Sequence, residues 1–125
     1  MCTPKLFISC PMRGLTRKTI KANIEKMHKI AEIIFDQELD VIQCYRPVEI
    51  AEGDNQASIW CLGRSIQMIS EADYYIGVNT FYGYSHACEI ENNVAINYGI
   101  QRYCVGLSVL NLPKKDLHYE KVKIK

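Results

Sequence analysis

The sequence predicts one α/β domain in which helices cover both faces of an open parallel sheet. Short β-rich, apolar runs alternate along the chain with longer segments of helical periodicity, which is typical of parallel strands joined by crossover helices. A length of 125 residues with 48% hydrophobic residues suits a single domain with a buried core. No repeat and no internal boundary is visible, so the domain is expected to span residues 1–125.

The first strand and the first helix are marked by different periodicities. Residues 5–9, Lys-Leu-Phe-Ile-Ser, form a short apolar run that Cys10 and Pro11 stop, as expected of a buried strand. The loop that follows ends at Thr16, a favourable N-cap residue. The next apolar residues recur at helical spacing: Ile20, Ile24, Met27, Ala31 and Ile34. We therefore expect a long amphipathic helix here.

The second strand and the second helix follow the same alternation. Residues 40–45 have the content of a strand, and an Arg-Pro pair ends them. Residues 48–54 are polar and show no periodicity, which indicates a loop. Residues 58–70 place three apolar side chains on one face, so we expect a helix there.

The remaining elements complete the pattern. Residues 73–78, Asp-Tyr-Tyr-Ile-Gly-Val, are β-rich and predict the third strand. A third helix is expected over residues 85–98, because Gly99 is typical of the position just after a helix. Residues 102–106 predict the fourth strand. The alternating tail, residues 121–125, suits a fifth strand at an edge guarded by lysines.

Composition excludes several classes of partner. The 15 basic residues nearly balance the 14 acidic ones, and this argues against a nucleic-acid polymer as partner. No apolar stretch approaches the roughly 18 residues of a membrane span, and no signal-peptide pattern opens the chain, so we expect a cytoplasmic protein without a membrane partner. The six cysteines form no Cys-x-x-Cys pair, and His86-x-Cys88 lacks a third ligand at suitable spacing. We expect reduced thiols, no metal and no cofactor.

The loops after the strands are where a ligand is expected, because open parallel sheets bind ligands beyond the carboxyl ends of their strands. The first of these loops begins at Ser9 and contains Arg13 and Gly14. The amides of the following helix start, together with Arg13, would form an anion site. The loop lacks the glycine patterns of dinucleotide and Walker loops. A plain connection with an exposed arginine therefore remains the alternative.

The acidic residue that stands out is Glu91. On a helical wheel it falls inside the apolar arc of the third helix, whose members are Ala87, Ile90, Val94, Ala95 and Tyr98. A carboxylate on a buried stripe is costly unless it is paired or used in chemistry. The structural alternative is a glutamate that caps backbone or pairs with an arginine.

Aromatic residues gather near the same loops. Phe81, Tyr82 and Tyr84 lie in the loop after the third strand, Tyr45 follows the second strand, and Trp60 lies in the second helix. Their rings could stack on a planar ligand such as a nucleobase. Packing against the domain or against a second subunit is the alternative.

Several motifs in order resemble the nucleoside 2-deoxyribosyltransferase-like superfamily over residues 5 to about 105. They are Lys-Leu-Phe-Ile-Ser with Pro-Met-Arg-Gly, Leu-Gly-Arg-Ser-Ile with Glu-Ala-Asp, and Cys-Glu-Ile-Glu-Asn-Asn-Val-Ala-Ile-Asn-Tyr-Gly-Ile. The resemblance is greatest to small bacterial and phage members with the Pro-Met-Arg-Gly motif. It implies a flavodoxin/Rossmann-like fold with strand order 2-1-3-4-5. It also implies cleavage of the N-glycosidic bond of a deoxynucleoside or its 5′-monophosphate.

The resemblance also implies roles for individual residues. Glu91, four residues before Ala95, matches the glutamate that attacks C1′ of the sugar to form a glycosyl-enzyme intermediate. Arg13, Gly14 and Ser85 match the phosphate site of the branch that hydrolyses deoxynucleoside 5′-monophosphates. The matching serine can serve the site of a neighbouring subunit, so the resemblance implies a homodimer or a higher homo-oligomer.

The sequence departs from the family pattern at two serines. Ser65 stands where active members usually carry an aspartate, and Ser85 stands where transferases carry one. We place Ser9, Ser65 and Tyr45 with the residues that bind substrate. The expected ligand is a small nucleoside or nucleotide, and the expected activity is glycosidic cleavage or deoxyribosyl transfer. A catalytically idle nucleotide-binding module and a protein that only contacts other subunits remain as alternatives.

Overall fold

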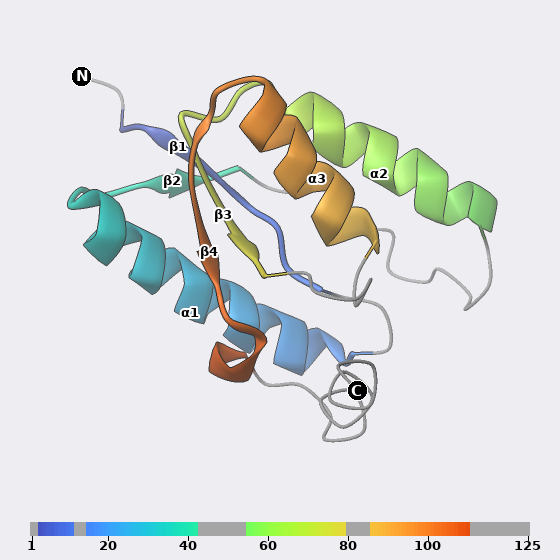
Figure 1. Cartoon of the computed structure of the whole chain (residues 1–125). Helices are drawn as coiled ribbons and strands as arrows, with labels where there is room; N and C mark the ends of the chain where they lie inside the picture. The colour runs from blue at the N-terminus through green and yellow to red at the C-terminus, as the bar shows by residue number, and fades with distance from the viewer. Residues whose placement is uncertain (1–2, 12–14, 43–54, 80–85, 111–125) are drawn as a thin grey trace, which may run out of the picture.

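The chain forms a three-layer α/β structure around a parallel sheet (Figure 1). The computed structural model describes residues 3–11, 15–42, 55–79 and 86–110 of the 125-residue chain. Within these ranges the strands are β1 (Lys5–Ile8), β2 (Asp40–Val41), β3 (Tyr74–Val78) and β4 (Gln101–Val105). All pairings are parallel and the order is β2-β1-β3-β4. The predicted fold class and this part of the strand order are confirmed, whereas the fifth strand expected at 121–125 lies outside the described residues.

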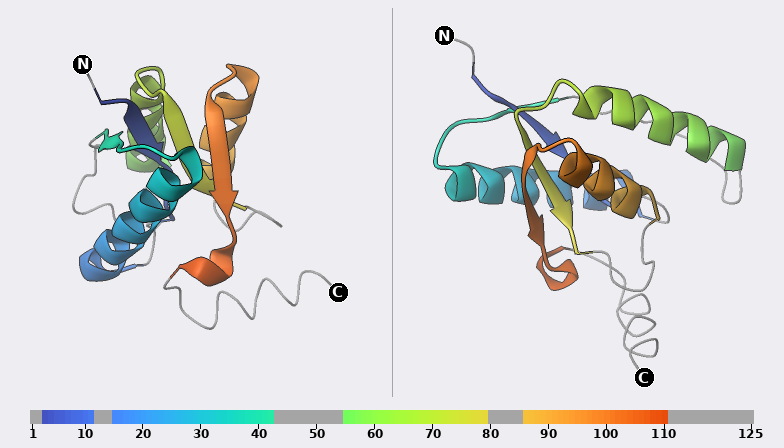
Figure 2. Two further views of the ribbon diagram at one scale, coloured as in Figure 1. Left: turned by 90° about the vertical axis from the view of Figure 1, so that its left-hand side faces the viewer. Right: turned by 45° about the horizontal axis from the view of Figure 1, so that its top comes forward.

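In the described part of the chain, three α-helices cover the two faces of the sheet. Figure 2 shows α1 (Arg17–Phe35) on one face, with α2 (Asn55–Ile69) and α3 (His86–Asn97) on the other. Because α1 and α2 lie on opposite faces, the chain leaves β1 on one side of the sheet and approaches β3 on the other. The strand order therefore reverses between β1 and β3, which is the topological switch point where open α/β sheets bind ligands.

The ends of the helices follow local sequence signals. The Thr16 side chain accepts a hydrogen bond from the Thr19 amide at 3.1 Å, which confirms Thr16 as the N-cap of α1. Helix α1 ends at Phe35, and its C-cap residue Asp36 has a left-handed φ of 54°. Beyond α3, Gly99 has a φ of 72°, a conformation that glycine adopts without steric cost. This confirms its predicted position after the helix.

Several element bounds differ from the prediction. Within the described residues β2 comprises Asp40 and Val41, which pair with Lys5 and Leu6, and residues 43–45 of the expected strand lie outside the described residues. Helix α2 starts at Asn55, three residues before the expected start. The loop expected at 48–54 lies outside the described residues.

The two faces of the sheet carry different side chains, because successive residues of a strand point to opposite sides. Leu6, Ile8, Ile76 and Val78 pack in the cluster that includes α1. Phe7 and Tyr75 pack with Ile69 of α2 and Ala95 of α3. The Phe7 and Tyr75 rings are stacked, with centroids 5.8 Å apart and planes 8° apart. Ser9 and Gly77 lie two residues after Phe7 and Tyr75, so alternation places them on the same side of the sheet as α2 and α3.

Candidate functional site

The candidate site lies where α3 crosses the carboxyl ends of β1 and β3. Ser9 directly follows β1 and is almost fully buried, and its amide donates to the Ile76 carbonyl of β3 at 2.8 Å. The Ser9 hydroxyl donates to Oε1 of Glu91 on α3 at 2.6 Å. Such a short O–H···O distance is typical of a hydrogen bond to a carboxylate. The bond holds the Glu91 carboxyl group at the switch point of the sheet.

Glu91 lies on the buried face of its helix, as the helical wheel predicted. Several of the apolar residues that were expected on that face are exposed, however. Glu91 is 8% exposed, and Cys88 and Ala95 are buried beside it at helical spacing. Ala87, Ile90 and Tyr98, which the prediction placed on the buried arc, are instead exposed. Glu91 therefore lies in the middle of the buried face of α3, between Cys88 and Ala95.

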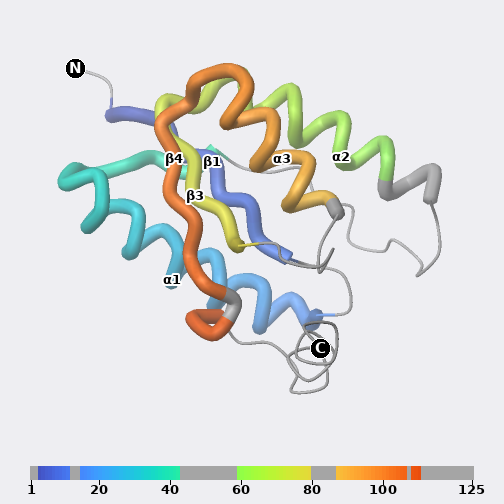
Figure 3. The backbone as a smooth tube through the Cα atoms, in the orientation of Figure 1, coloured from blue at the N-terminus to red at the C-terminus, as the bar shows by residue number. Residues whose placement is uncertain are grey.

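The environment of Glu91 favours its protonated form. Burial is the main cause and raises the pKa of Glu91 from its ordinary value of 4.5 to about 7. Hydrogen bonding by the Ser9 and Ser65 side chains favours the charged form and offsets part of this rise. Ser65 lies on α2, which packs beside α3 (Figure 3). Near neutral pH the carboxyl group is therefore divided between its protonated and ionised forms.

Tyr75 and Gly77 of β3 belong to this site, and sequence reasoning missed both. The Tyr75 side chain is fully buried, and its hydroxyl has no hydrogen-bond partner within the described part of the chain. The ring lies across Gly77, where a Cβ atom would be 2.8 Å from the tyrosine hydroxyl. A glycine inside a strand often marks such a close approach, so the Gly in Tyr-Tyr-Ile-Gly-Val was the available signal.

Burial is also the main influence on Tyr75, and it raises the pKa of the hydroxyl well above the ordinary 10.0. The nearby Ser9 hydroxyl opposes this rise, although its geometry toward Tyr75 falls short of a hydrogen bond. The charge of Glu91 adds to the rise, which indicates that the phenol and the carboxyl group are close neighbours. The phenol keeps its proton throughout the physiological range.

The structure brings three of the predicted site residues together. Ser9, Ser65 and Glu91 come from β1, α2 and α3 and surround one carboxyl group. The other four predicted site residues lie outside the described residues: Arg13, Gly14, Tyr45 and Ser85. Trp60, considered as a stacking surface, is 55% exposed on α2.

The described residues offer no metal site and no spanning helix. No group of three or more His, Cys, Asp or Glu side chains in these ranges could hold a metal ion. No described helix is both long enough and apolar enough to cross a membrane. The groups that the candidate site itself contains are a buried carboxyl group and its hydroxyl neighbours.

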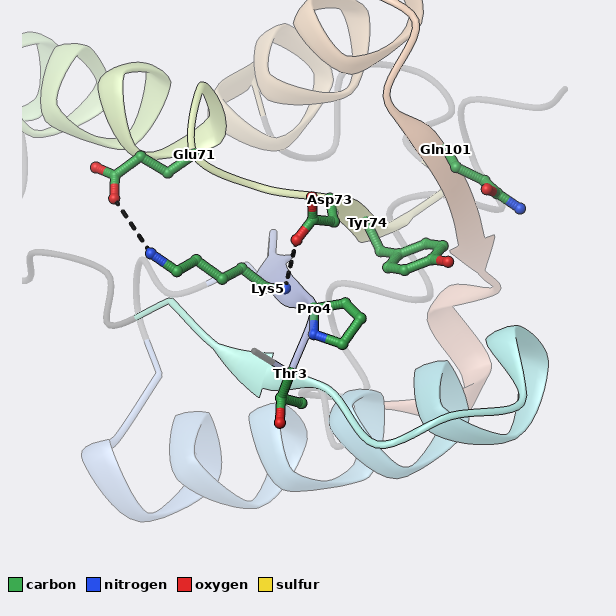
Figure 4. A pocket seen from close by; sticks show the side chains of 7 residues that line it. All are labelled: Thr3, Pro4, Lys5, Glu71, Asp73, Tyr74 and Gln101. Atoms are coloured by element: carbon green, nitrogen blue, oxygen red, sulfur yellow. Dashed lines mark hydrogen bonds and ion pairs between the residues drawn. The ribbon is translucent and has the colours of Figure 1, made fainter. Parts of the chain in front are cut away.

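A hollow lies at the opposite, amino-terminal edge of the sheet (Figure 4). It is open and is lined by residues from the starts of β1, β3 and β4. Its charged groups are already engaged: Asp73 accepts from the Lys5 amide at 2.9 Å, and the Lys5 ammonium lies 3.9 Å from Glu71. These contacts join the β1 start to the α2–β3 turn, which is a structural role.

Fold and site together define an open parallel α/β domain with a buried, hydroxyl-bonded glutamate at its switch point. Comparison of the chain with protein-family models, with curated proteins and with solved structures finds no match in any of the three.

Proposed function

We propose that this chain cleaves or transfers the N-glycosidic bond of a nucleoside or nucleoside 5′-monophosphate, with Glu91 as the nucleophile. The observation that carries the proposal is the Glu91 carboxyl group, buried at the switch point and held by Ser9 at 2.6 Å. A carboxylate so placed can meet a ligand that enters beyond the strand ends. The motif resemblance, which selects the same glutamate, supports the substrate class.

In the proposed reaction the ionised Glu91 attacks C1′ of the sugar. The C1′–N bond breaks, its electron pair leaves with the base, and a glycosyl ester forms on Glu91. Water, or the ring nitrogen of a second base, then attacks C1′ and releases the carboxylate. Proton delivery to the departing base comes from solvent or from residues beyond the described ranges. The Ser9 hydrogen bond to Oε1 orients the carboxylate for this attack.

Ser65 has a defined part in this proposal. Its side chain favours the ionised form of Glu91 by hydrogen bonding. An aspartate at that position would place a second negative charge beside the nucleophile, whereas a serine supplies a neutral donor. Ser65 therefore supports the charge on Glu91 and does not protonate the leaving base.

Binding of the 5′-phosphate is assigned by resemblance, and contact with the base is assigned from the aromatic ring of Tyr45. Arg13, Gly14 and Ser85 would hold a 5′-phosphate, and Tyr45 would contact the base. The resemblance also supports a homodimer or higher homo-oligomer. A reducing, cytoplasmic setting is proposed as well.

The test is incubation of the pure protein with a panel of deoxynucleosides and their 5′-monophosphates, with free base measured by chromatography. We expect release whose rate rises with pH through about 7, because only ionised Glu91 attacks. Glu91→Gln should abolish release, and Glu89→Gln on the same helix is the matched control. Absence of base release from every substrate, or equal release by Glu91→Gln, would contradict the enzymatic proposal.

A second candidate is a binding module that uses the same site without turnover. Ser65 favours it, since this residue stands where active members of the superfamily usually carry an aspartate placed to orient the sugar or to assist base departure. Calorimetric titration with the same panel separates the two candidates: tight binding without base release selects the module. A chain that responds to no nucleotide would instead point to a protein that only contacts other subunits.

A further inference from the structure

Tyr75 is the buried polar side chain that the proposed reaction leaves without a role. It is fully buried, and no described residue hydrogen-bonds its hydroxyl. Burying a hydroxyl without a partner is unfavourable, and a phenylalanine would stack on Phe7 equally well without that cost. An unsatisfied buried hydroxyl therefore requires an explanation beyond packing.

The position of the hydroxyl is fixed by the sheet. Stacking on Phe7 orients the ring, and Gly77 leaves the space that the hydroxyl end of the ring occupies. Strand register pairs Phe7 with Tyr75 and Ile8 with Ile76, so the next step places Ser9 opposite Gly77. The Tyr75 hydroxyl, which lies over Gly77, is thus directed toward Ser9 and the carboxyl end of the sheet.

The Ser9 hydroxyl group can accept a hydrogen bond in addition to the one that it donates. A serine hydroxyl carries one proton, and Ser9 gives it to Oε1 of Glu91. The lone pairs of the Ser9 oxygen can still accept, and the protonated phenol of Tyr75 can donate. A small movement of either side chain would align the three groups in sequence.

We propose that Tyr75 is a positioning residue that donates to the Ser9 oxygen when Glu91 is ionised, forming a hydrogen-bond chain from Tyr75 through Ser9 to Glu91. Hydrogen bonds in such chains polarise and strengthen one another, so the phenol would support the negative charge without touching the ligand. The inference deepens the proposed function, since it concerns the carboxylate proposed to react, but its test needs no substrate.

Within the described ranges, few other titratable groups lie around Glu91 and Tyr75. Cys88 on α3 and Cys104 on β4 both influence Tyr75. Burial raises the pKa of the Cys104 thiol, while Arg102, 3.4 Å from its sulfur, opposes that rise. Ser65 on α2 and Ser9 on β1 face Glu91 but carry no charge. Titration of Glu91 near neutral pH is therefore separable from that of the Cys104 thiol.

The test is the titration midpoint of Glu91 in full-length Tyr75→Phe, followed by carbon-13 NMR of labelled glutamate carboxyls and assigned with Glu91→Gln. We expect the midpoint to rise by roughly half a pH unit or more, because the ionised form loses support. Tyr74→Phe is the matched control: Tyr74 packs on the α1 face, and its hydroxyl accepts from Gln37 at 2.6 Å. That variant should keep the wild-type midpoint.

A second measurement covers the case in which Tyr75→Phe does not fold. In wild-type protein with tyrosines labelled at Cζ, one resonance should move downfield with the Glu91 midpoint, and it should lose that movement in Glu91→Gln. An unchanged Glu91 midpoint in folded Tyr75→Phe, or no tyrosine resonance that follows Glu91, overturns the inference. Neither result depends on base release, so failure of the proposed activity and failure of this inference are distinguishable.

Discussion

Replacing Glu91 with glutamine should stabilise the fold above neutral pH and change it little in weak acid. The folded chain holds a proton on Glu91 up to about pH 7, whereas the same carboxyl group in the unfolded chain releases it near its ordinary 4.5. Between these values the folded state binds more protons, so the free energy of unfolding falls as pH rises. The substitution removes that fall, because glutamine keeps a similar shape without the charge.

The size of the effect follows from the pKa change. A rise from 4.5 to about 7 corresponds to about 3 kcal/mol between the protonated and ionised states. The advantage of Glu91→Gln over wild type should therefore grow from about pH 4.5 and level off above about pH 7. At that plateau it corresponds to roughly 10 °C in Tm for a domain of this length.

The assay is urea denaturation, supported by thermal melts, of both proteins from pH 4 to 9. Glu25→Gln provides a matched control, because Glu25 is exposed on α1, and its curve should run parallel to wild type. A stability difference between Glu91→Gln and wild type that does not vary with pH would refute the reasoning. A wild-type protein that becomes more stable between pH 5 and 7 relative to Glu91→Gln would refute it equally, since it would mean that the site favours the charge.

Two further predictions probe the surroundings of the carboxyl group. Ser9→Ala removes the 2.6 Å donor to Glu91, so the Glu91 midpoint in NMR titration should rise, and any base release at neutral pH should fall several-fold. An unchanged midpoint would show that the hydrogen bond is unimportant in solution. Gly77→Ala would place a methyl group 2.8 Å from the Tyr75 hydroxyl and should destabilise by about 1–3 kcal/mol in urea. Gly63 lies within α2, and a Cβ atom there would meet no other atom within 4 Å, so Gly63→Ala should instead stabilise the fold by up to about 1 kcal/mol. Equal effects of the two substitutions would contradict the close approach of the Tyr75 ring to Gly77.

How much of the structure can be predicted from the sequence depends on whether each feature is set by local interactions or by contacts between residues far apart in the sequence. Strand and helix periodicity is local, so the alternation of elements and the burial of Glu91 on its helix could be predicted. The switch point follows from the strand order β2-β1-β3-β4, and the order came from resemblance to a family.

The contacts within the site lie beyond local patterns. Ser9 and Glu91 are 82 residues apart, and their hydrogen bond exists because α3 crosses the end of β1. Ser65 reaches the same group only through the packing of α2 against α3. Tyr75 and Gly77 could have been found by asking why a buried strand contains a glycine two residues after a tyrosine, since those two positions share one face.

A purely structural role explains Glu91 less well than a chemical one. A structural carboxylate in a core is normally held by a cation or by backbone amides, which compensate for the lost hydration. Within the described ranges Glu91 is held by hydroxyl groups, and these leave its pKa near 7, so ionisation remains unfavourable there. A glutamine or a leucine would serve packing without this cost. Glu91 also lies beside a phenol that is itself unsatisfied. A buried carboxyl group with a raised pKa and a phenol without a described hydrogen-bond partner, both at the switch point of one sheet, support the proposal that a ligand binds there.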